Sequence, residues 1–494
     1  MILTQLERLL IWLVPTALFV AFLGWLGVNG FFSADVMRAT GFGILDAEGH
    51  STFAEFVTRY PTLPSVAAMT ATWAAPWSPL PQPLLVSAGL GGLIIVGLAW
   101  GYRKAGYDRW VTLALVALVA LNPVFLRLMS EGEAFWPVAG GTLFAAGMLR
   151  LRHGVVVTNA IIIAIAMFLL IPSHKVGITL VISALPFLVL ACPPSILSIS
   201  AVGAYMALLF PSLFLVLSLV YVSQVFQGDA LAFVADVMRD WNLSPIVVPT
   251  AGEHMDPTGG VLAGLLSVAL VAPIMPAMLV MGWQNVALRM ANIALLATAC
   301  VSVTLCLIAF PQMEPVTALG PILGFAAAAV SWIPRWRRRQ AIAIALALLG
   351  LIGSAISLGL DGRSESTRWI RAALGEPAGP SPLDPMVDLG ARLAGHDGIM
   401  LDPEVMPEAI AARRTSKGLI LPTDGEFRRT FMTRILTAPA IVVLDPDRWL
   451  RPDRIGRNFP DFYGRGADGY QLAYDGGYYR IYQRTGTPGR SEVP

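Results

Sequence analysis

The chain has 494 residues, of which 56% are hydrophobic and only 13% are charged. Ordinary soluble domains carry roughly 25% charged residues, so this composition excludes a typical water-soluble protein and makes membrane lipid the expected partner. The formal net charge of +2, and the absence of a Lys/Arg-rich tract with interleaved aromatic residues, argue against nucleic-acid binding.

Apolar stretches that could cross a bilayer recur along the first 360 residues. The hydrocarbon layer is about 30 Å thick, so a spanning helix needs roughly 17 to 25 apolar residues. The pattern predicts an α-helical polytopic membrane protein with about eleven transmembrane helices in residues 1–360. The expected spans are residues 9–28, 84–102, 110–128, 135–149, 155–172, 176–192, 197–222, 259–283, 287–310, 315–333 and 340–359.

The loops between these spans differ in charge. Most Lys and Arg residues before residue 340 fall in the loops on the side of the N-terminus, whereas most carboxylates fall in the opposite loops. Because basic residues next to spans favour the cytoplasm, we expect the N-terminus inside and, after an odd number of spans, the C-terminus outside. If the host is a Gram-negative bacterium, the expected localisation is its inner (plasma) membrane, with a periplasmic or extracytoplasmic C-terminal domain.

Two loops on the predicted outer side are long enough to form structure. In outer loop 29–83, apolar residues recur at helical spacing from Phe53 to Tyr60, which is typical of a helix on the membrane surface. Outer loop 223–258 repeats this pattern from Val234 to Trp241. We therefore expect one surface helix in each loop.

The last part of the chain has a soluble composition. Residues 361–385 end in a Gly/Pro-rich stretch and are expected to form a linker. In residues 386–494, short apolar runs alternate with helical patterns, which predicts a small α/β domain. Asp475-Gly476-Gly477 is a turn signal between two aromatic-rich segments, so we expect a β-hairpin there.

Asp35 is the first candidate for catalysis. It follows the first predicted span, where its carboxylate would lie near the headgroups and could accept the proton of an incoming hydroxyl. A solvated loop aspartate is the alternative interpretation. Other candidate site residues in the same loop are Asp46, Arg59 and Tyr60.

Charged residues also gather where two later spans reach the outer side. Arg127, Glu131 and Glu133 follow the third span, and His174 and Lys175 follow the fifth. Cations at this depth can hold a lipid phosphate, because a guanidinium binds it with two donors and an ammonium attracts it as a point charge. The alternative is that these side chains only anchor the helix ends at the membrane surface.

A metal site is weakly indicated. Glu253, His254 and Asp256 offer carboxylate and imidazole donors close together, so a divalent cation stays open as a cofactor. Their spacing is not that of a helix face, and the three cysteines all lie in apolar runs, so no thiolate site is expected. No other cofactor is indicated.

The arrangement resembles the C-type membrane glycosyltransferases, which include the protein O-mannosyltransferases, the aminoarabinose lipid A transferase and the oligosaccharyltransferase catalytic subunit. Asp35 stands where the family has its catalytic acid. The stretch Tyr60-Pro61-Thr62-Leu63-Pro64 is similar to the Tyr-Pro-Pro-Leu stretch of many bacterial members, with Thr62 in place of a proline. Residues 122–133 are similar to their turn between the third and fourth spans.

The resemblance implies transfer of a sugar from a polyprenyl-phosphate donor to a glycan, lipid or protein acceptor of the cell envelope. It implies that Asp35 acts as the base and that Arg127, His174 and Lys175 bind the donor phosphate. Two other functions stay open: a polysaccharide polymerase or ligase, and a non-catalytic membrane component of exopolysaccharide assembly or export.

Overall fold

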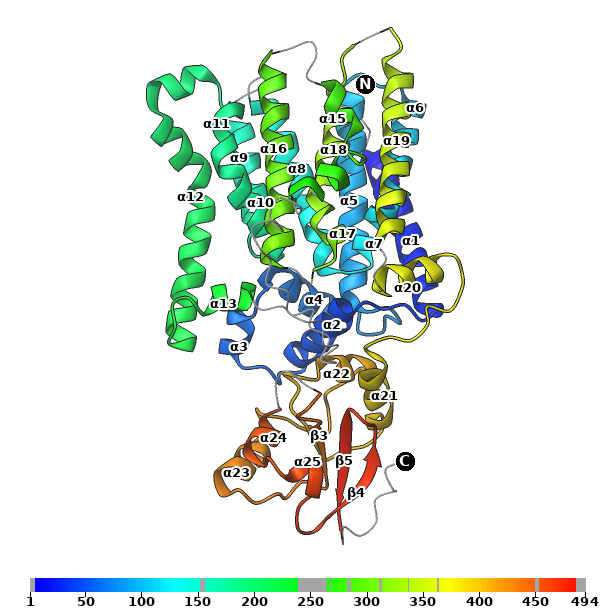
Figure 1. Ribbon diagram of the computed structural model, residues 1–494, viewed down its shortest axis with the longest axis vertical. Coiled ribbons are helices and arrows are strands. Elements are labelled where there is room, and N and C mark those ends of the chain that lie inside the picture. The colour runs from blue at the N-terminus through cyan, green and yellow to red at the C-terminus, as the bar shows by residue number, and fades with distance from the viewer. Residues whose placement is uncertain are drawn as a thin grey trace.

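The structure is a computed structural model that describes residues 5–151, 156–238, 264–266, 268–281, 286–310, 313–335, 337–361, 364–448 and 453–485. The described chain is mostly helical and is arranged in three levels (Figure 1). A bundle of apolar helices forms the first level, short helices form the second, and a small α/β domain forms the third. The N-terminus and the α/β domain lie at opposite ends of the molecule.

Five helices in the described ranges are long and apolar enough to cross a membrane. They are α1 (Gln5–Val28), α5 (Gln82–Lys104), α12 (Pro194–Gln227), α16 (Val286–Ala309) and α19 (Arg339–Leu360). The predicted span 110–128 is broken into α6 (Arg109–Ala120) and α7 (Pro123–Met129), which meet at 56°. The side chain of Asn122 caps α7, and Pro123 cannot donate a hydrogen bond back to α6, so the chain turns here.

Shorter helices fill the rest of the bundle. They are α8 (Trp136–Leu151), α9 (Val156–Leu170), α10 (Lys175–Ala184), α11 (Leu188–Ala191), α15 (Pro276–Met281), α17 (Pro315–Ala318) and α18 (Gly320–Val330). Proline explains two of the breaks, because Pro186 lies in the 3-10 turn after α10 and Pro321 lies in the first turn of α18. Part of the predicted span 259–283 lies outside the described residues. Among the described helices, length and apolar composition support five spans, or six if α6 and α7 together form one.

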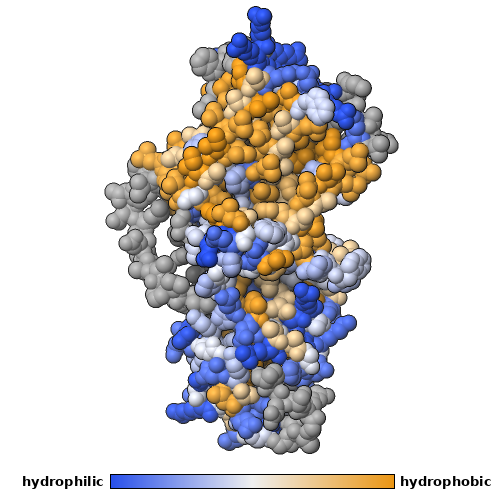
Figure 2. Space-filling view, turned by 90° about the vertical axis from the view of Figure 1, so that its right-hand side faces the viewer, coloured by the Kyte–Doolittle hydropathy of each residue, from blue (hydrophilic) through white to orange (hydrophobic). Residues whose placement is uncertain are grey.

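The surface agrees with a membrane environment. Figure 2 shows a broad apolar region around the bundle on one face and a hydrophilic surface over the α/β domain. Large apolar side chains such as Trp25, Ile161 and Phe214 are exposed on the helices. Exposed apolar area of this extent is stable against lipid rather than water.

Outer loop 29–83 is more ordered than the predicted single surface helix. It forms α2 (Ala34–Ala47), α3 (Phe53–Thr58) and α4 (Thr62–Ala74). The second level also contains α13 (Ala232–Met238), from the other long loop, and α20 (Ser364–Ala373), from the segment expected as a linker. Residues 239–258 of the second loop lie outside the described residues.

The α/β domain contains a mixed five-stranded sheet with strand order β2-β1-β3-β5-β4. The strands are β1 (Ile399–Met400), β2 (Leu419–Ile420), β3 (Ala440–Leu444), β4 (Tyr470–Asp475) and β5 (Tyr479–Arg484). One face packs against α21 (Asp384–Leu393) and α22 (Pro407–Arg413). The other packs against α23 (Gly425–Thr433), α24 (Arg454–Asn458) and α25 (Phe462–Arg465). The predicted hairpin is confirmed as β4 and β5, which pair antiparallel around the turn at Gly477.

Helix α2 joins the α/β domain to the bundle. Ile44 and Leu45 of α2 belong to the same buried cluster as Ile410 of α22. A Cβ at Gly41 would overlap the carbonyl oxygen of Pro407, so α2 and α22 can approach this closely only because residue 41 is glycine. The α/β domain therefore packs directly on α2, the helix that carries Asp35 in its first turn.

Candidate functional site

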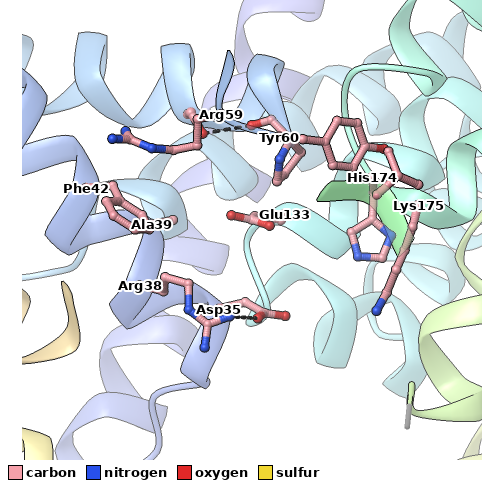
Figure 3. A pocket seen from close by; sticks show the side chains of 12 residues that line it. Asp35, Arg38, Ala39, Phe42, Arg59, Tyr60, Glu133, His174 and Lys175 are labelled. Carbon is pink, nitrogen blue, oxygen red and sulfur yellow. Dashed lines mark hydrogen bonds and ion pairs between the residues drawn. The ribbon is translucent and has the colours of Figure 1, made fainter. Parts of the chain in front are cut away.

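A cavity with about 610 Å³ of unoccupied space, partly open to solvent, lies between the bundle and the short helices. Its lining residues come from α2, from α4 and the loop before it, from the turn after α7, from the start of α10 and the residue before it, and from α13. They are Asp35, Arg38, Ala39, Phe42, Arg59, Tyr60, Pro61, Ser65, Glu133, His174, Lys175 and Val237. Figure 3 shows Asp35, Glu133, Lys175 and His174 around this space.

Asp35 is held in the first turn of α2. Ser33 caps the helix by accepting a hydrogen bond from the backbone NH of Val36, and its hydroxyl donates to the carbonyl of Ser130 over 3.3 Å. These contacts tie the start of α2 to the turn after α7. Burial raises the pKa of Asp35, and the charges of Arg38 and Lys175 oppose this shift. A carboxylate with a raised pKa is a stronger base than a solvated one.

Arg38 connects Asp35 to the α/β domain. Its Nη1 lies 3.8 Å from the Asp35 carboxylate, and its Nε donates to Oε1 of Glu408 over 3.3 Å. The Glu408 side chain is only 2% exposed and comes from α22. Arg38 is not among the site residues predicted from the sequence. Its position three residues after Asp35 on a helix was the available signal.

Glu133 is the second carboxylate of the cavity. Burial raises its pKa well above the usual value, and the nearby Asp35 carboxylate adds to this shift. Two acidic groups that face one cavity can hold a proton between them more readily than two separate carboxylates. Glu133 therefore keeps its proton to a higher pH than a solvated glutamate does.

His174 and Lys175 line the other side of the cavity. Nδ1 of His174 accepts the backbone NH of Val176 over 3.2 Å, so the ring proton is on Nε2. Burial lowers the pKa of His174 to about 3, with the Lys175 charge acting in the same direction. His174 thus faces the cavity as a neutral donor. The Lys175 ammonium, which lies 4.9 Å from the ring centroid of Phe310, supplies the positive charge.

Tyr60, Arg59 and Asp46 form the side of the cavity towards α4. The Tyr60 hydroxyl donates to the carbonyl of Ile171 over 3.1 Å, which ties the first outer loop to the end of α9. Arg59 pairs with Asp46 at 2.6 Å and lies over the ring of Phe42. Asp46 does not line the cavity. Its ion pair with Arg59 helps to hold the Arg59 guanidinium at the cavity wall.

Arg127 and Glu131 lie outside the cavity lining. Arg127 is fully buried and pairs with Glu131 at 2.6 Å and with Glu314 at 2.8 Å. Its guanidinium also lies 5.5 Å from the ring centroid of Phe31. Of the three residues expected to hold a phosphate, the structure brings His174 and Lys175 into one cavity with Asp35. It places Arg127 in a closed ion-pair cluster.

The metal candidates Glu253, His254 and Asp256 lie outside the described residues. Among the residues that the structure describes, no group of three or more His, Cys, Asp or Glu side chains could hold a metal ion. Arg38, Arg59 and Lys175 are the cationic side chains in the cavity lining that could neutralise an anion.

No family model and no curated protein matches the sequence. The structure is similar to the crystal structure of ArnT from Cupriavidus metallidurans bound to undecaprenyl phosphate. The TM-score is 0.53 at 12% sequence identity, and the match covers 96% of this chain and 99% of that one. The apo oligosaccharyltransferase of Archaeoglobus fulgidus matches with a TM-score of 0.41 and 13% identity over 89% of this chain and 70% of that one. The chain has the fold of the C-type membrane glycosyltransferases.

Proposed function

We propose that this chain is a membrane glycosyltransferase that moves a sugar from a polyprenyl-phosphate donor to a cell-envelope glycan, lipid or protein acceptor. The single observation that carries the proposal is the convergence of Asp35 and Lys175 on one cavity at the end of the apolar bundle. A base and a fixed cation are the two groups that such a transfer requires. The fold shared with ArnT, which was crystallised with undecaprenyl phosphate, supports a polyprenyl lipid as the donor carrier.

In the proposed reaction, Asp35 takes the proton of the acceptor hydroxyl. The hydroxyl oxygen then bonds to the anomeric carbon of the sugar as the bond between that carbon and the phosphate oxygen breaks. The electron pair leaves with the polyprenyl phosphate. Lys175, with the neutral Nε2–H of His174, stabilises the negative charge on that phosphate. A single displacement of this kind inverts the configuration at the anomeric carbon.

The buried cluster of Arg127 has a supporting role in this mechanism. Ser130 follows Arg127 and accepts the hydroxyl hydrogen bond of Ser33, which caps the helix of Asp35. Glu314 raises the pKa of Asp35 and Arg127 lowers it, so the cluster brings little net charge to the base. Arg127 therefore acts as a positioning residue for the base.

The direction of the chain in the membrane follows from its charge pattern. We infer that the cavity and the α/β domain lie on the outer face, with the basic loops near Arg103 and Arg338 in the cytoplasm. The acceptor would then be an envelope component, and the localisation a bacterial inner membrane with a periplasmic domain. A reporter fused after residue 494 that faced the cytoplasm would contradict this orientation.

Replacing Asp35 with Asn tests the proposed chemistry. In the purified protein with a polyprenyl-phosphate-linked sugar, D35N should lower the transfer rate by roughly 100- to 10,000-fold, because Asn cannot accept the proton. Asp447→Asn is the matched control, since Asp447 is exposed in the α/β domain, and it should transfer at the normal rate. Unchanged transfer by D35N would remove the base from the mechanism and favour a non-catalytic assembly component. Release of long glycan blocks instead of single sugars would favour a polymerase or ligase.

A further inference from the structure

A second hollow lies in the α/β domain, between α23 and α24. It borders about 960 Å³ of unoccupied space, part of which is open solvent. Three arginines, one asparagine and four apolar residues line it, and none of the lining residues is acidic. They are Pro422, Phe427, Arg428, Phe431, Met432, Arg454, Arg457 and Asn458, and together we call them the basic groove.

Two arginines of the basic groove are available to a ligand. Arg428 and Arg457 are exposed, and in the described part of the chain neither has a carboxylate within ion-pair distance. Arg454 differs, because it pairs with Glu404 at 2.8 Å and lies 3.8 Å from Glu55. The Nε of Arg428 donates to the carbonyl oxygen of Pro422 over 3.3 Å. Its terminal guanidinium nitrogens and the guanidinium of Arg457 can still donate to an anion.

The floor of the groove is apolar. The rings of Phe427 and Phe431 are stacked with their centroids 4.6 Å apart, and the Met432 side chain beside them is 85% exposed. Small-molecule sites typically combine such an apolar floor with a few placed polar groups. A saccharide that carries phosphate or carboxylate groups fits both features, because its ring C–H face can pack on Phe431 and Met432 while the arginines bind its acidic groups.

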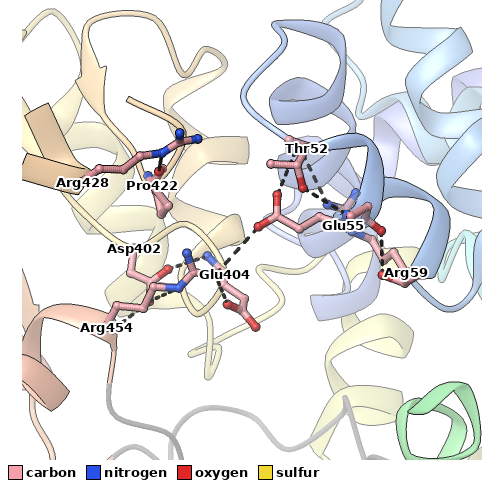
Figure 4. A network of polar contacts seen from close by, with 11 residues as sticks. Thr52, Glu55, Arg59, Asp402, Glu404, Pro422, Arg428 and Arg454 are labelled. Atoms are coloured by element: carbon pink, nitrogen blue, oxygen red, sulfur yellow. Dashed lines mark hydrogen bonds and ion pairs between the residues drawn. The ribbon is translucent and has the colours of Figure 1, made fainter. Parts of the chain in front are cut away.

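The groove is linked to the cavity through α3. Figure 4 shows Arg454 of the α/β domain facing Glu55 of α3 across the space between them. Thr52 and Glu55 form a capping box at the start of α3, and Arg59 at its end lines the cavity with Asp35. A helix of six residues is about 9 Å long. Arg454 of the groove therefore faces the start of the helix whose C-cap residue, Arg59, lines the cavity.

We propose that the basic groove binds an anionic glycan, bearing phosphate or uronate groups, as the distal part of the acceptor. This inference rests on the proposed glycosyltransferase function. Charge complementarity favours this ligand, since the groove presents cations without acidic neighbours among its lining residues. Its position favours a soluble glycan over membrane lipid, because α23 and α24 lie beyond the level of α2 to α4 from the apolar bundle (Figure 1).

Binding of defined oligosaccharides to the full-length protein in neutral-lipid nanodiscs tests the proposal. An oligogalacturonate should bind in a salt-dependent manner, and a malto-oligosaccharide of the same length should bind at least about tenfold more weakly. The double variant Arg428→Gln and Arg457→Gln should lose about tenfold or more in affinity for the oligogalacturonate. Arg429→Gln is the matched control, because Arg429 is exposed on the same helix but does not line the groove, and it should bind like the unmodified protein.

Three results would overturn the proposal. One is equal binding of the neutral oligosaccharide, and another is an equal loss in Arg429→Gln, which would indicate only a diffuse basic surface. The third is a preference for phosphatidylglycerol vesicles or for poly-glutamate over the oligogalacturonate. All substituted arginines are exposed, so matching thermal unfolding curves confirm folding. D35N should bind the oligogalacturonate normally, so failure of D35N to impair transfer would reject the catalytic role of Asp35 without affecting the groove.

Discussion

Two groups of charged side chains lie at the same end of the helical bundle, and they differ in whether they are closed. In the closed group, Arg127 is fully buried and faces Glu131 and Glu314 at 2.6 and 2.8 Å. In the open group, Asp35 and Lys175 line a cavity. Both groups combine acids with cations near helix ends, and both looked alike as candidate sites in the sequence.

The comparison shows what separates a structural charge from one available to a ligand. A buried guanidinium with two carboxylates at contact distance has its charge neutralised within the protein, and losing one partner leaves the others buried and uncompensated. Side chains that line a cavity can still offer charge and hydrogen bonds to a molecule that enters it. The residue types are the same in both groups, so the surroundings decide the role.

Arg127→Met should give the largest effect on stability. It leaves Glu131 and Glu314 buried without their cation, which should cost about 3 to 5 kcal/mol. Thermal unfolding in detergent measures this. Lys175→Met is the matched substitution in the open group, and it should lower sugar transfer by about 100-fold with much less loss of stability. If the two variants lost stability equally, the distinction between the closed and open groups would be wrong.

The pH dependence of the transfer rate tests whether Arg38 and Glu408 set the pKa of Asp35 in the open group. Asp35 acts as a base only when ionised, so the rate should rise with pH through its raised pKa. Arg38→Gln removes a charge that lowers this pKa, so the rise should move to higher pH. Glu408→Gln leaves Arg38 without its buried carboxylate partner, so the rise should move to lower pH. Shifts in the same direction, or none, would show that Arg38 and Glu408 only support the fold.

A closed carboxylate without a cation should give the smallest effect. Glu48 accepts hydrogen bonds from the hydroxyl of Thr415 and from the backbone NH and hydroxyl of Ser416, at 2.6 to 2.8 Å. Burial raises the pKa of Glu48, but these hydrogen bonds outweigh it and lower the pKa overall. The contact should therefore stabilise the protein above the unfolded-state pKa and be lost as pH falls through the folded-state pKa.

Glu48→Gln checks this expectation. The variant should be less stable than the unmodified protein by about 1 kcal/mol at neutral pH, because a charged acceptor is replaced by a neutral one. The difference should vanish in acid, where Glu48 is protonated in both states. Unfolding followed at several pH values measures it, and a difference that stayed constant with pH would contradict the proposed role of the charge.

Much of the fold could be predicted because its signals are local. Long apolar runs predict helices in a membrane, and an Asp-Gly-Gly turn between aromatic runs predicts the hairpin of β4 and β5. The broken spans were harder to recognise, because hydropathy averages over a window and does not register where Pro123 or Pro321 starts a new helix. Helices α2 and α4 were missed because their apolar residues are mixed with small and polar ones.

An acid after the first apolar span and cations after the third and fifth can be recognised in the sequence alone. Which of these side chains come together depends on how the chain folds in space. Lys175 lines the same cavity as Asp35, and Arg127 forms an ion pair with Glu314. Glu408 of the α/β domain pairs with Arg38. The physical reason is that pairing between charges depends on distance in space and on burial. Neither leaves a periodic pattern in a chain whose partners are more than a hundred residues apart.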